Sequence, residues 1–285
     1  MKKLIHLIIS FSAFGICFLL ASLADSELNS EAFSLKEVIV YIFSIQWIVF
    51  IPAYLLKSEK FYDLTGSFTY VFAVIFVLYN STQNIANLIL GGAIIFWAVR
   101  LGIFLFFRIK KAGEDKRFKE IKLSPTRFFM AWSLQGMWVS ICSLCALTAL
   151  SSQTGVVENV FLFIGLIIFL FGYTLEIIAD KQKTKFRSVE ENKDKFITTG
   201  LWSKSRHPNY LGEILLWFGI AVMSISSLSG YQYLTLISPV FSYVLIYYVS
   251  GVRLLEESAK KNGETWILTK NTLKILLFYF LNKTQ

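Results

Sequence analysis

Long apolar runs separated by short polar segments make up most of this 285-residue chain. A membrane-spanning helix needs about 20 apolar residues, and most of the runs approach that length. The pattern therefore predicts an all-α fold, a polytopic transmembrane helix bundle of seven to eight spans that forms a single integral membrane domain over residues 1–285. The last two runs allow either two short spans or one re-entrant hairpin. The runs lie at residues 4–23, 37–56, 64–79, 85–107, 128–150, 158–179, 210–227 and 233–250.

Composition agrees with a membrane location. Hydrophobic residues make up 55% of the chain, charged residues make up 16%, and the mean hydropathy is +0.58. A soluble domain has roughly 25% charged residues. The lipid bilayer is therefore the expected partner.

Basic residues are concentrated in alternate loops. Segments 108–127 and 180–208 each carry eight Lys or Arg residues. Basic loops of membrane proteins face the cytoplasm, so eight spans would place both termini and both basic segments on that side. This distribution accounts for much of the net charge of +9 and argues against nucleic acid as a partner. The loops that lack Lys and Arg lie at 24–35, 80–84, 151–157 and 228–232.

The chain contains few residues that could bind a metal ion. Its two histidines, His6 and His207, are distant in the sequence, and its three cysteines fall within apolar runs. Structural zinc sites use Cys and His at short spacings, so we expect no metal site.

The most informative polar stretch is residues 196–217, where a basic segment leads directly into an apolar helix. Proline suits the first position of a helix because its missing N–H would have no partner there. Pro208 therefore predicts a helix start, with His207 at or beside the N-cap. Arg206 and His207 then flank the positive end of the helix dipole, which suits a phosphate or a carboxylate. An interfacial anchor without a ligand is the alternative.

Two polar stripes are predicted on consecutive helices. Asn209 and Glu213 are four residues apart and share one helical face. An ionisable group within an apolar run, such as Glu213, needs a partner. The other stripe runs out of the preceding span, and its acids and bases either hold a ribose and phosphates or pair with one another. It comprises Glu176, Asp180, Lys183 and Arg187.

Two further polar motifs lie near helix ends. Tyr62 and Asp63 precede the third apolar run, where an aspartate commonly caps the helix. Segment 113–120 is charged and amphipathic, which is typical of a solvated face.

The segment Arg206-His-Pro-Asn-Tyr-Leu-Gly-Glu213 resembles the bacterial branch of the steroid 5-alpha-reductase family. The motifs Trp97-Ala-Val-Arg-Leu-Gly102 and Gln135-Gly-Met-Trp138 extend the resemblance to a reductase-like region of residues 60–260. The resemblance implies a bundle of seven or eight helices, in the bacterial inner membrane, that binds NADPH from the cytoplasmic side. It also implies reduction of a carbon–carbon double bond conjugated to a ketone in a lipophilic small molecule.

The resemblance also implies roles for individual residues. Arg206 and His207, at the helix start, join the cofactor set through their suitability for an anion. A reduction of this kind also needs an acid at the carbonyl oxygen. Tyr62 and Asp63 at a cytoplasmic helix end, and Tyr210 beside the cofactor residues, are candidates; the alternative is that all three are interfacial groups. By resemblance, the cofactor contacts are Asp180, Arg187, Asn209, Glu213 and Arg253.

A second enzyme class shares part of this pattern. Membrane methyltransferases that cap isoprenylcysteine carry Arg-His-Pro-x-Tyr-x-Gly and a later Arg-x-x-Glu-Glu. Arg206-His-Pro-Asn-Tyr-Leu-Gly212 and Arg253-Leu-Leu-Glu-Glu257 are similar to both motifs. That resemblance implies S-adenosylmethionine as the cofactor instead of NADPH.

Overall fold

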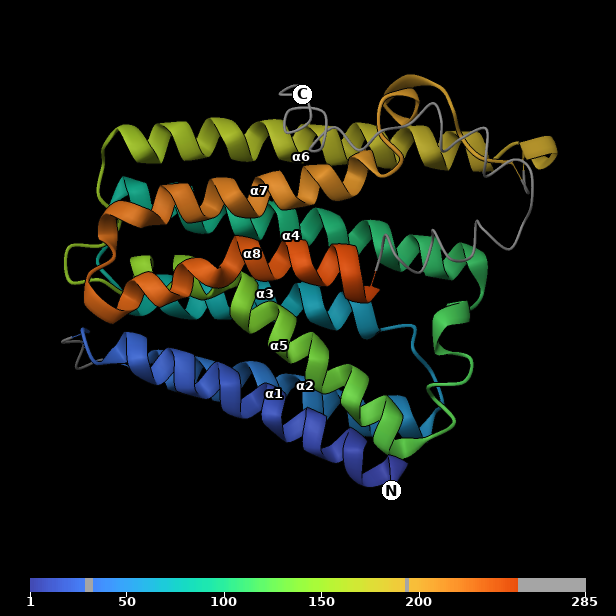
Figure 1. Cartoon of the computed structure of the whole chain (residues 1–285), viewed down its shortest axis with the longest axis horizontal. Helices are drawn as coiled ribbons and strands as arrows, with labels where there is room; N and C mark the ends of the chain where they lie inside the picture. Colours follow the sequence, from blue (N-terminus) through green and yellow to red (C-terminus); the bar gives the residue numbers. More distant parts are fainter. Residues whose placement is uncertain (29–32, 193–194, 251–285) are drawn as a thin grey trace, which may run out of the picture. The chain divides into compact units, whose positions relative to one another are not determined.

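The computed structural model describes residues 1–28, 33–192 and 195–250 (Figure 1). Over these ranges the chain is helical and contains no β-strand, which confirms the all-α prediction. The α-helices are α1 (Lys2–Asp25), α2 (Leu35–Leu55), α3 (Tyr62–Asn80), α4 (Ile85–Ala112), α5 (Pro125–Leu150), α6 (Val160–Arg187), α7 (Pro208–Ser224) and α8 (Ile237–Val244). Short 3₁₀ segments lie at Lys116–Phe118, Glu190–Asn192, Gly200–Ser203, Ile225–Ser227 and Gly230–Leu236, and a π-helix at Leu245–Ser250.

Seven helices in the described ranges are long and apolar enough to cross a membrane, and the protein is an integral membrane protein. The seventh extends α7 to Ser227. Helix α8 has eight residues and continues into the π-helix, so the eighth span stays a prediction. Helices α4 and α6 have 28 residues each, or about 42 Å. Both are longer than a hydrocarbon core of about 30 Å and therefore reach beyond it.

The helices group into two compact units. Of the described residues, unit 1 comprises Met1–Gly165 and Ile220–Ser238, and unit 2 comprises Leu166–Gly219 and residues 239–250. The single domain over 1–285 and the reductase-like region 60–260 stay predictions.

Helix α5 is the centre of unit 1 and packs against α1, α2 and α3. In its most apolar window 83% of residues are buried. Many of the buried residues are small, as expected where membrane helices approach closely without a hydrophobic driving force. They include Ser133, Gly136, Ser140, Cys142, Ser143, Cys145 and Ala146.

Polar contacts mark the two ends of unit 1. At one end, His6 near the start of α1 lies 3.2 Å from Thr126 at the start of α5, measured between Nδ1 and Oγ1. At the other, the Thr82 hydroxyl before α4 donates to the carbonyl of Gln153 after α5, at 2.9 Å. Consecutive helices of this unit therefore run in alternating directions, as the charge pattern requires. Which end faces the cytoplasm stays a prediction.

Candidate functional site

Helices α6 and α7 meet at a pair of glycines within unit 2. A Cβ atom on Gly172 would lie 2.6 Å from the Gly212 carbonyl oxygen, and one on Gly212 would lie 2.6 Å from the Gly172 carbonyl oxygen. Only glycine permits this approach. The Gly212 Cβ position is also 3.0 Å from Cβ of Glu176. Glu176 therefore lies against the face of α7 that carries Asn209 and Glu213.

The two polar stripes predicted from the sequence thus face each other. Asp180 lies one turn beyond Glu176 on α6, and these side chains are only 7% and 3% exposed. Buried carboxylates require partners, and Glu176, Asp180 and Glu213 each have one. Arg187 is the last residue of α6 and is exposed. The acids of the stripe are therefore inside the unit, and its terminal base is at the surface.

The connection between α6 and α7 folds back onto α6. The Trp202 indole N–H donates to the Ala179 carbonyl at 3.1 Å, and the Leu201 backbone N–H donates to Oε1 of Gln182 at 3.0 Å. The Lys183 ammonium lies 4.9 Å from the centroid of the Trp202 ring, which is cation–π distance. This polar connection therefore borders the α6 stripe.

Sequence reasoning misses Gln182 and Trp202. The glycine at position 200 could have indicated a turn here, because its backbone adopts a φ of +64° that favours glycine. A Cβ atom there would also lie 2.6 Å from Nε2 of Gln182. The motif Thr-Thr-Gly-Leu-Trp is thus a turn that closes onto the preceding helix.

Helix α7 begins at Pro208, which confirms the predicted helix start. His207 precedes it, its backbone N–H donates to the Ser205 hydroxyl at 3.3 Å, and its imidazole stacks on the Tyr210 ring at 5.6 Å between centroids. Asn209 Oδ1 is buried and accepts no hydrogen bond from any described residue. The start of α7 therefore presents a buried acceptor beside the acids of α6.

The predicted cofactor residues are accounted for as follows. Unit 2 contains all of them except Arg253, which lies outside the described residues. Arg206, at the start of α7, has an interaction partner and is partly buried. Their roles in binding stay predictions, as does that of Tyr210.

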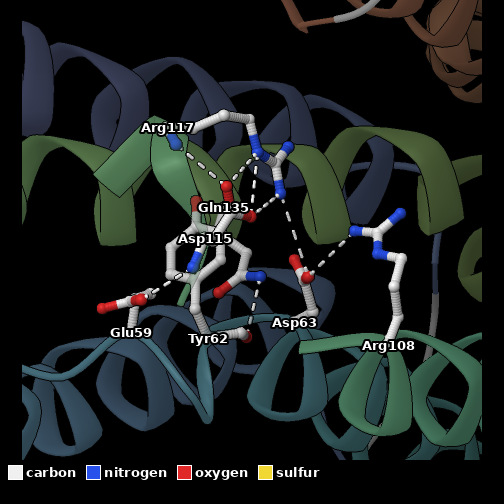
Figure 2. Close-up of polar contacts among 7 residues, drawn as sticks. All are labelled: Glu59, Tyr62, Asp63, Arg108, Asp115, Arg117 and Gln135. Carbon is white, nitrogen blue, oxygen red and sulfur yellow. Dashed lines mark hydrogen bonds and ion pairs between the residues drawn. The ribbon is translucent and has the colours of Figure 1, made fainter. Parts of the chain in front are cut away.

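Tyr62 and Asp63 open helix α3 in unit 1, where they belong to a second polar group (Figure 2). The Tyr62 hydroxyl donates to the Ala131 carbonyl at 2.8 Å. Asp63 Oδ2 lies 3.9 Å from the guanidinium of Arg108 and 4.0 Å from that of Arg117, and accepts no hydrogen bond from the described residues. Both side chains are engaged in unit 1, and their catalytic roles stay predictions.

Residues 113–124, here called the strap, do not form a wholly solvated face. Phe118 is only 5% exposed, and its ring lies 4.7 Å from that of Tyr62. Glu59, 2% exposed, holds the strap at two points. Its carboxylate accepts from the Asp115 N–H at 2.9 Å and from the Lys122 ammonium at 2.7 Å. The contact between Phe118 and Tyr62 and the hydrogen bonds to Glu59 therefore hold the charged segment against unit 1.

Hydrogen bonds determine the ionisation of Glu59 and of Asp115 in the strap. Burial alone would raise the pKa of Glu59, but the Lys122 ammonium and the Asp115 N–H hold that pKa below its ordinary value. Burial likewise opposes ionisation of Asp115, but Arg117, whose Nε donates to it at 3.0 Å, holds the pKa of Asp115 below its ordinary value. Both acids are charged at neutral pH, so the strap is held by ion pairs.

Comparison with protein families matches residues 49–266 to a family described as "Protein of unknown function (DUF1295)". The chain belongs to the DUF1295 family. The match covers well over half of the chain and includes the strap, the α6–α7 pair and the motif at the start of α7.

A relative of this DUF1295 protein occurs in Ustilaginoidea virens, where it is named "Probable O-methyltransferase ustE". The two sequences are 34% identical over 109 residues, which are 33% of this chain and 38% of the relative. The chain therefore matches well under half of that protein's length. No solved structure matches the chain.

Proposed function

We propose that this protein is an NADPH-dependent membrane reductase that acts on a carbon–carbon double bond conjugated to a ketone in a lipid-soluble molecule. The observation that carries the proposal is the Gly172–Gly212 contact, which sets the acids of α6 against the polar face of α7. The resemblance of residues 206–213 to the bacterial steroid 5-alpha-reductases supports the choice of cofactor.

The residues of unit 2 suit a dinucleotide. Buried carboxylates such as Glu176 and Asp180 accept hydrogen bonds from ribose hydroxyls, while Arg206 and the start of α7 suit phosphate. Asn209 Oδ1 is a buried acceptor without a donor among the described residues, which is costly unless a ligand supplies one. A ribose hydroxyl or a carboxamide N–H of the cofactor would supply that donor.

NADPH, when bound, supplies the hydride, and the chain must bind it, exclude water and place an acid. The apolar helices admit a lipid-soluble substrate and keep water away. Of the three candidate acids, Tyr62 would first have to release the Ala131 carbonyl, and Asp63 is flanked by two guanidiniums. Tyr210 adjoins Asn209 in unit 2, beside the proposed cofactor residues, so we favour Tyr210.

A methyltransferase is the second candidate, favoured by the name of the relative from Ustilaginoidea virens. S-adenosylmethionine also carries a ribose and a carboxylate, so the polar face between α6 and α7 suits its groups as well. The loose match of Arg206-His-Pro-Asn-Tyr-Leu-Gly212 to the isoprenylcysteine methyltransferases supports the same candidate.

Calorimetric titration of the purified full chain in detergent tests the choice. NADPH, NADH and S-adenosylmethionine are titrated in parallel into one preparation. We expect saturable binding of NADPH, weaker binding of NADH and no binding of S-adenosylmethionine. Binding of S-adenosylmethionine alone would replace the reductase by the methyltransferase, and binding of none of the three would remove both candidates.

The reaction class is tested separately by following the loss of NADPH absorbance. Enone sterols, polyprenyl ketones and fatty enones are supplied in mixed micelles, and saturated ketones of the same skeletons serve as controls. We expect oxidation of NADPH with at least one enone and with none of the saturated ketones. Oxidation with both sets alike would indicate attack on the carbonyl group instead of the double bond.

A further inference from the structure

Helix α5 carries two buried polar atoms that have no hydrogen-bond partner among the described residues. The Trp132 side chain is fully buried, and its indole N–H finds no acceptor. Gln135 is 8% exposed, and its Oε1 finds no donor. The two residues are three positions apart on one helix, so their side chains are neighbours. One unused donor and one unused acceptor therefore belong to neighbouring side chains inside unit 1.

The Trp132 and Gln135 side chains both contact Tyr62. The Trp132 ring stands edge-on to the Tyr62 ring, with 5.2 Å between centroids. Gln135 donates through Nε2 to the Tyr62 backbone carbonyl at 3.0 Å (Figure 2). This bond fixes which end of the amide is the nitrogen, so Oε1 is the unused acceptor. A Cβ atom on Gly66 would lie 2.6 Å from Nε2 of Gln135, so glycine there makes room for the amide.

A single hydroxyl group matches this pair. Its oxygen accepts from the Trp132 N–H, and its hydrogen is donated to Gln135 Oε1. A ketone oxygen can accept from the Trp132 N–H, but it leaves Gln135 Oε1 without a donor because a carbonyl has no hydrogen to give. We propose that Trp132 and Gln135 bind the hydroxyl group of a lipid-soluble alcohol.

The strap covers this site at one end of unit 1. Phe118 packs on Tyr62, and its ring lies 6.0 Å from that of Phe128, which in turn lies 6.0 Å from Trp132. Tyr62 is the first residue of α3, so the pair lies near a membrane boundary. The hydroxyl of a dissolved alcohol lies at such a boundary while its hydrocarbon part stays in the bilayer. Lifting Phe118 would open the site at that level.

The proposal goes beyond the reductase and does not rest on it. The site is built from α3, α5 and the strap, and none of its residues belongs to the proposed cofactor set. The alcohol is predicted as a ligand of unit 1, whether or not NADPH binds.

The test uses three probes with the same carbon skeleton: farnesol, its aldehyde farnesal, and the hydrocarbon farnesene. Thermal unfolding of the purified full chain in detergent is followed as each probe is titrated. We expect farnesol to raise Tm saturably, farnesal to do so less, and farnesene not at all. Trp132→Phe keeps an aromatic ring, although a smaller one, and removes the N–H, and should weaken farnesol binding about threefold to tenfold.

Two further variants complete the test. Gln135→Met should remove the preference for farnesol over farnesal, and Trp138→Phe, the same change elsewhere on α5, should keep it. Equal Tm shifts with the three probes would overturn the proposal. A farnesol preference that survives both Trp132→Phe and Gln135→Met would also overturn the proposal. In that case Trp132 and Gln135 would be a site for water. NADPH titration of the same proteins separates the two hypotheses, because failure of cofactor binding leaves the farnesol result intact.

Discussion

Gly172 on α6 and Gly212 on α7 exclude each other's side chains: a Cβ atom on either would lie 2.6 Å from the carbonyl oxygen of the other. Helices in a bilayer gain little from the hydrophobic effect when they associate, so close packing of small residues holds them together. The same contact sets Glu176 against α7. Packing and the candidate cofactor site therefore depend on the same two glycines.

Gly212→Ala should destabilise the protein by about 1–3 kcal/mol, because the new methyl group forces α6 and α7 apart. Thermal unfolding in detergent measures the loss, and NADPH affinity should fall with it because Glu176 moves away from α7. Gly92→Ala is the matched control, since a Cβ atom there meets nothing within 4 Å and should stabilise the helix by about 0.5–1 kcal/mol. A Gly212→Ala protein as stable as wild type would contradict the contact.

Asn209→Ala and Glu213→Gln should weaken NADPH binding about tenfold to a hundredfold while the protein stays folded. Each change removes a hydrogen bond to a charged or buried group, worth roughly 1.5–3 kcal/mol. Calorimetry gives the affinity and thermal unfolding gives the stability. Glu158→Gln, at an exposed position in the α5–α6 connection, is the control. Normal NADPH affinity together with a lower Tm would show that both residues are structural.

The seven long helices of the described residues could be predicted in order because the length of an apolar run is a local property. The helix ends were less predictable. Helix α4 continues to Ala112, beyond the apolar run that ends at residue 107, because charged residues are good helix formers. It stops at Gly113, which adopts a φ of +83°, a conformation that favours glycine.

Helical periodicity also predicted the two polar stripes, since spacings of three and four residues define a face. Their meeting depends on Gly172 and Gly212, which no local pattern connects. The strap shows the same limit, because Phe118 stands among charges and its partner Tyr62 is distant in the sequence. The bond from Lys122 to Glu59 spans 63 residues. Contacts of this kind follow from the tertiary fold and not from local spacing.

Lys122→Met should cost on the order of 3 kcal/mol at pH 7, because it leaves the buried Glu59 carboxylate without its cation. The pKa of Glu59 is lowered in the folded protein, below an unfolded value of about 4.3. The stabilisation is therefore present above that value and is lost as the pH falls through the folded pKa. The Tm difference between wild type and variant should be large at pH 7 and should shrink in acid.

Lys119→Met provides the control for the Lys122 experiment, because Lys119 is exposed on the same strap. It should change Tm little at either pH. A Lys122→Met deficit that is equally large in acid would mean that the pair contributes through packing and not through charge.

Reporter fusions test the orientation of the chain. A reporter in the strap, or after Gln285, should behave as cytoplasmic, and one within residues 81–84 should behave as external, because basic loops stay inside. The two reporters within unit 1 lie at opposite ends of α4, so they should report opposite sides of the membrane. An external C-terminus would mean that residues 210–250 do not cross the membrane twice.

Tyr62→Phe and Tyr210→Phe should separate a structural tyrosine from a catalytic one. Tyr62→Phe removes the hydroxyl that donates to the Ala131 carbonyl and should lower stability by about 0.5–1.5 kcal/mol, while turnover per folded molecule stays near wild type. Tyr210→Phe should keep NADPH affinity and lose turnover of an enone substrate roughly a hundredfold or more, as expected when a general acid is removed. Loss of turnover in Tyr62→Phe alone would identify Tyr62 as the general acid instead of Tyr210. Normal turnover in both would leave Asp63 or water as the acid.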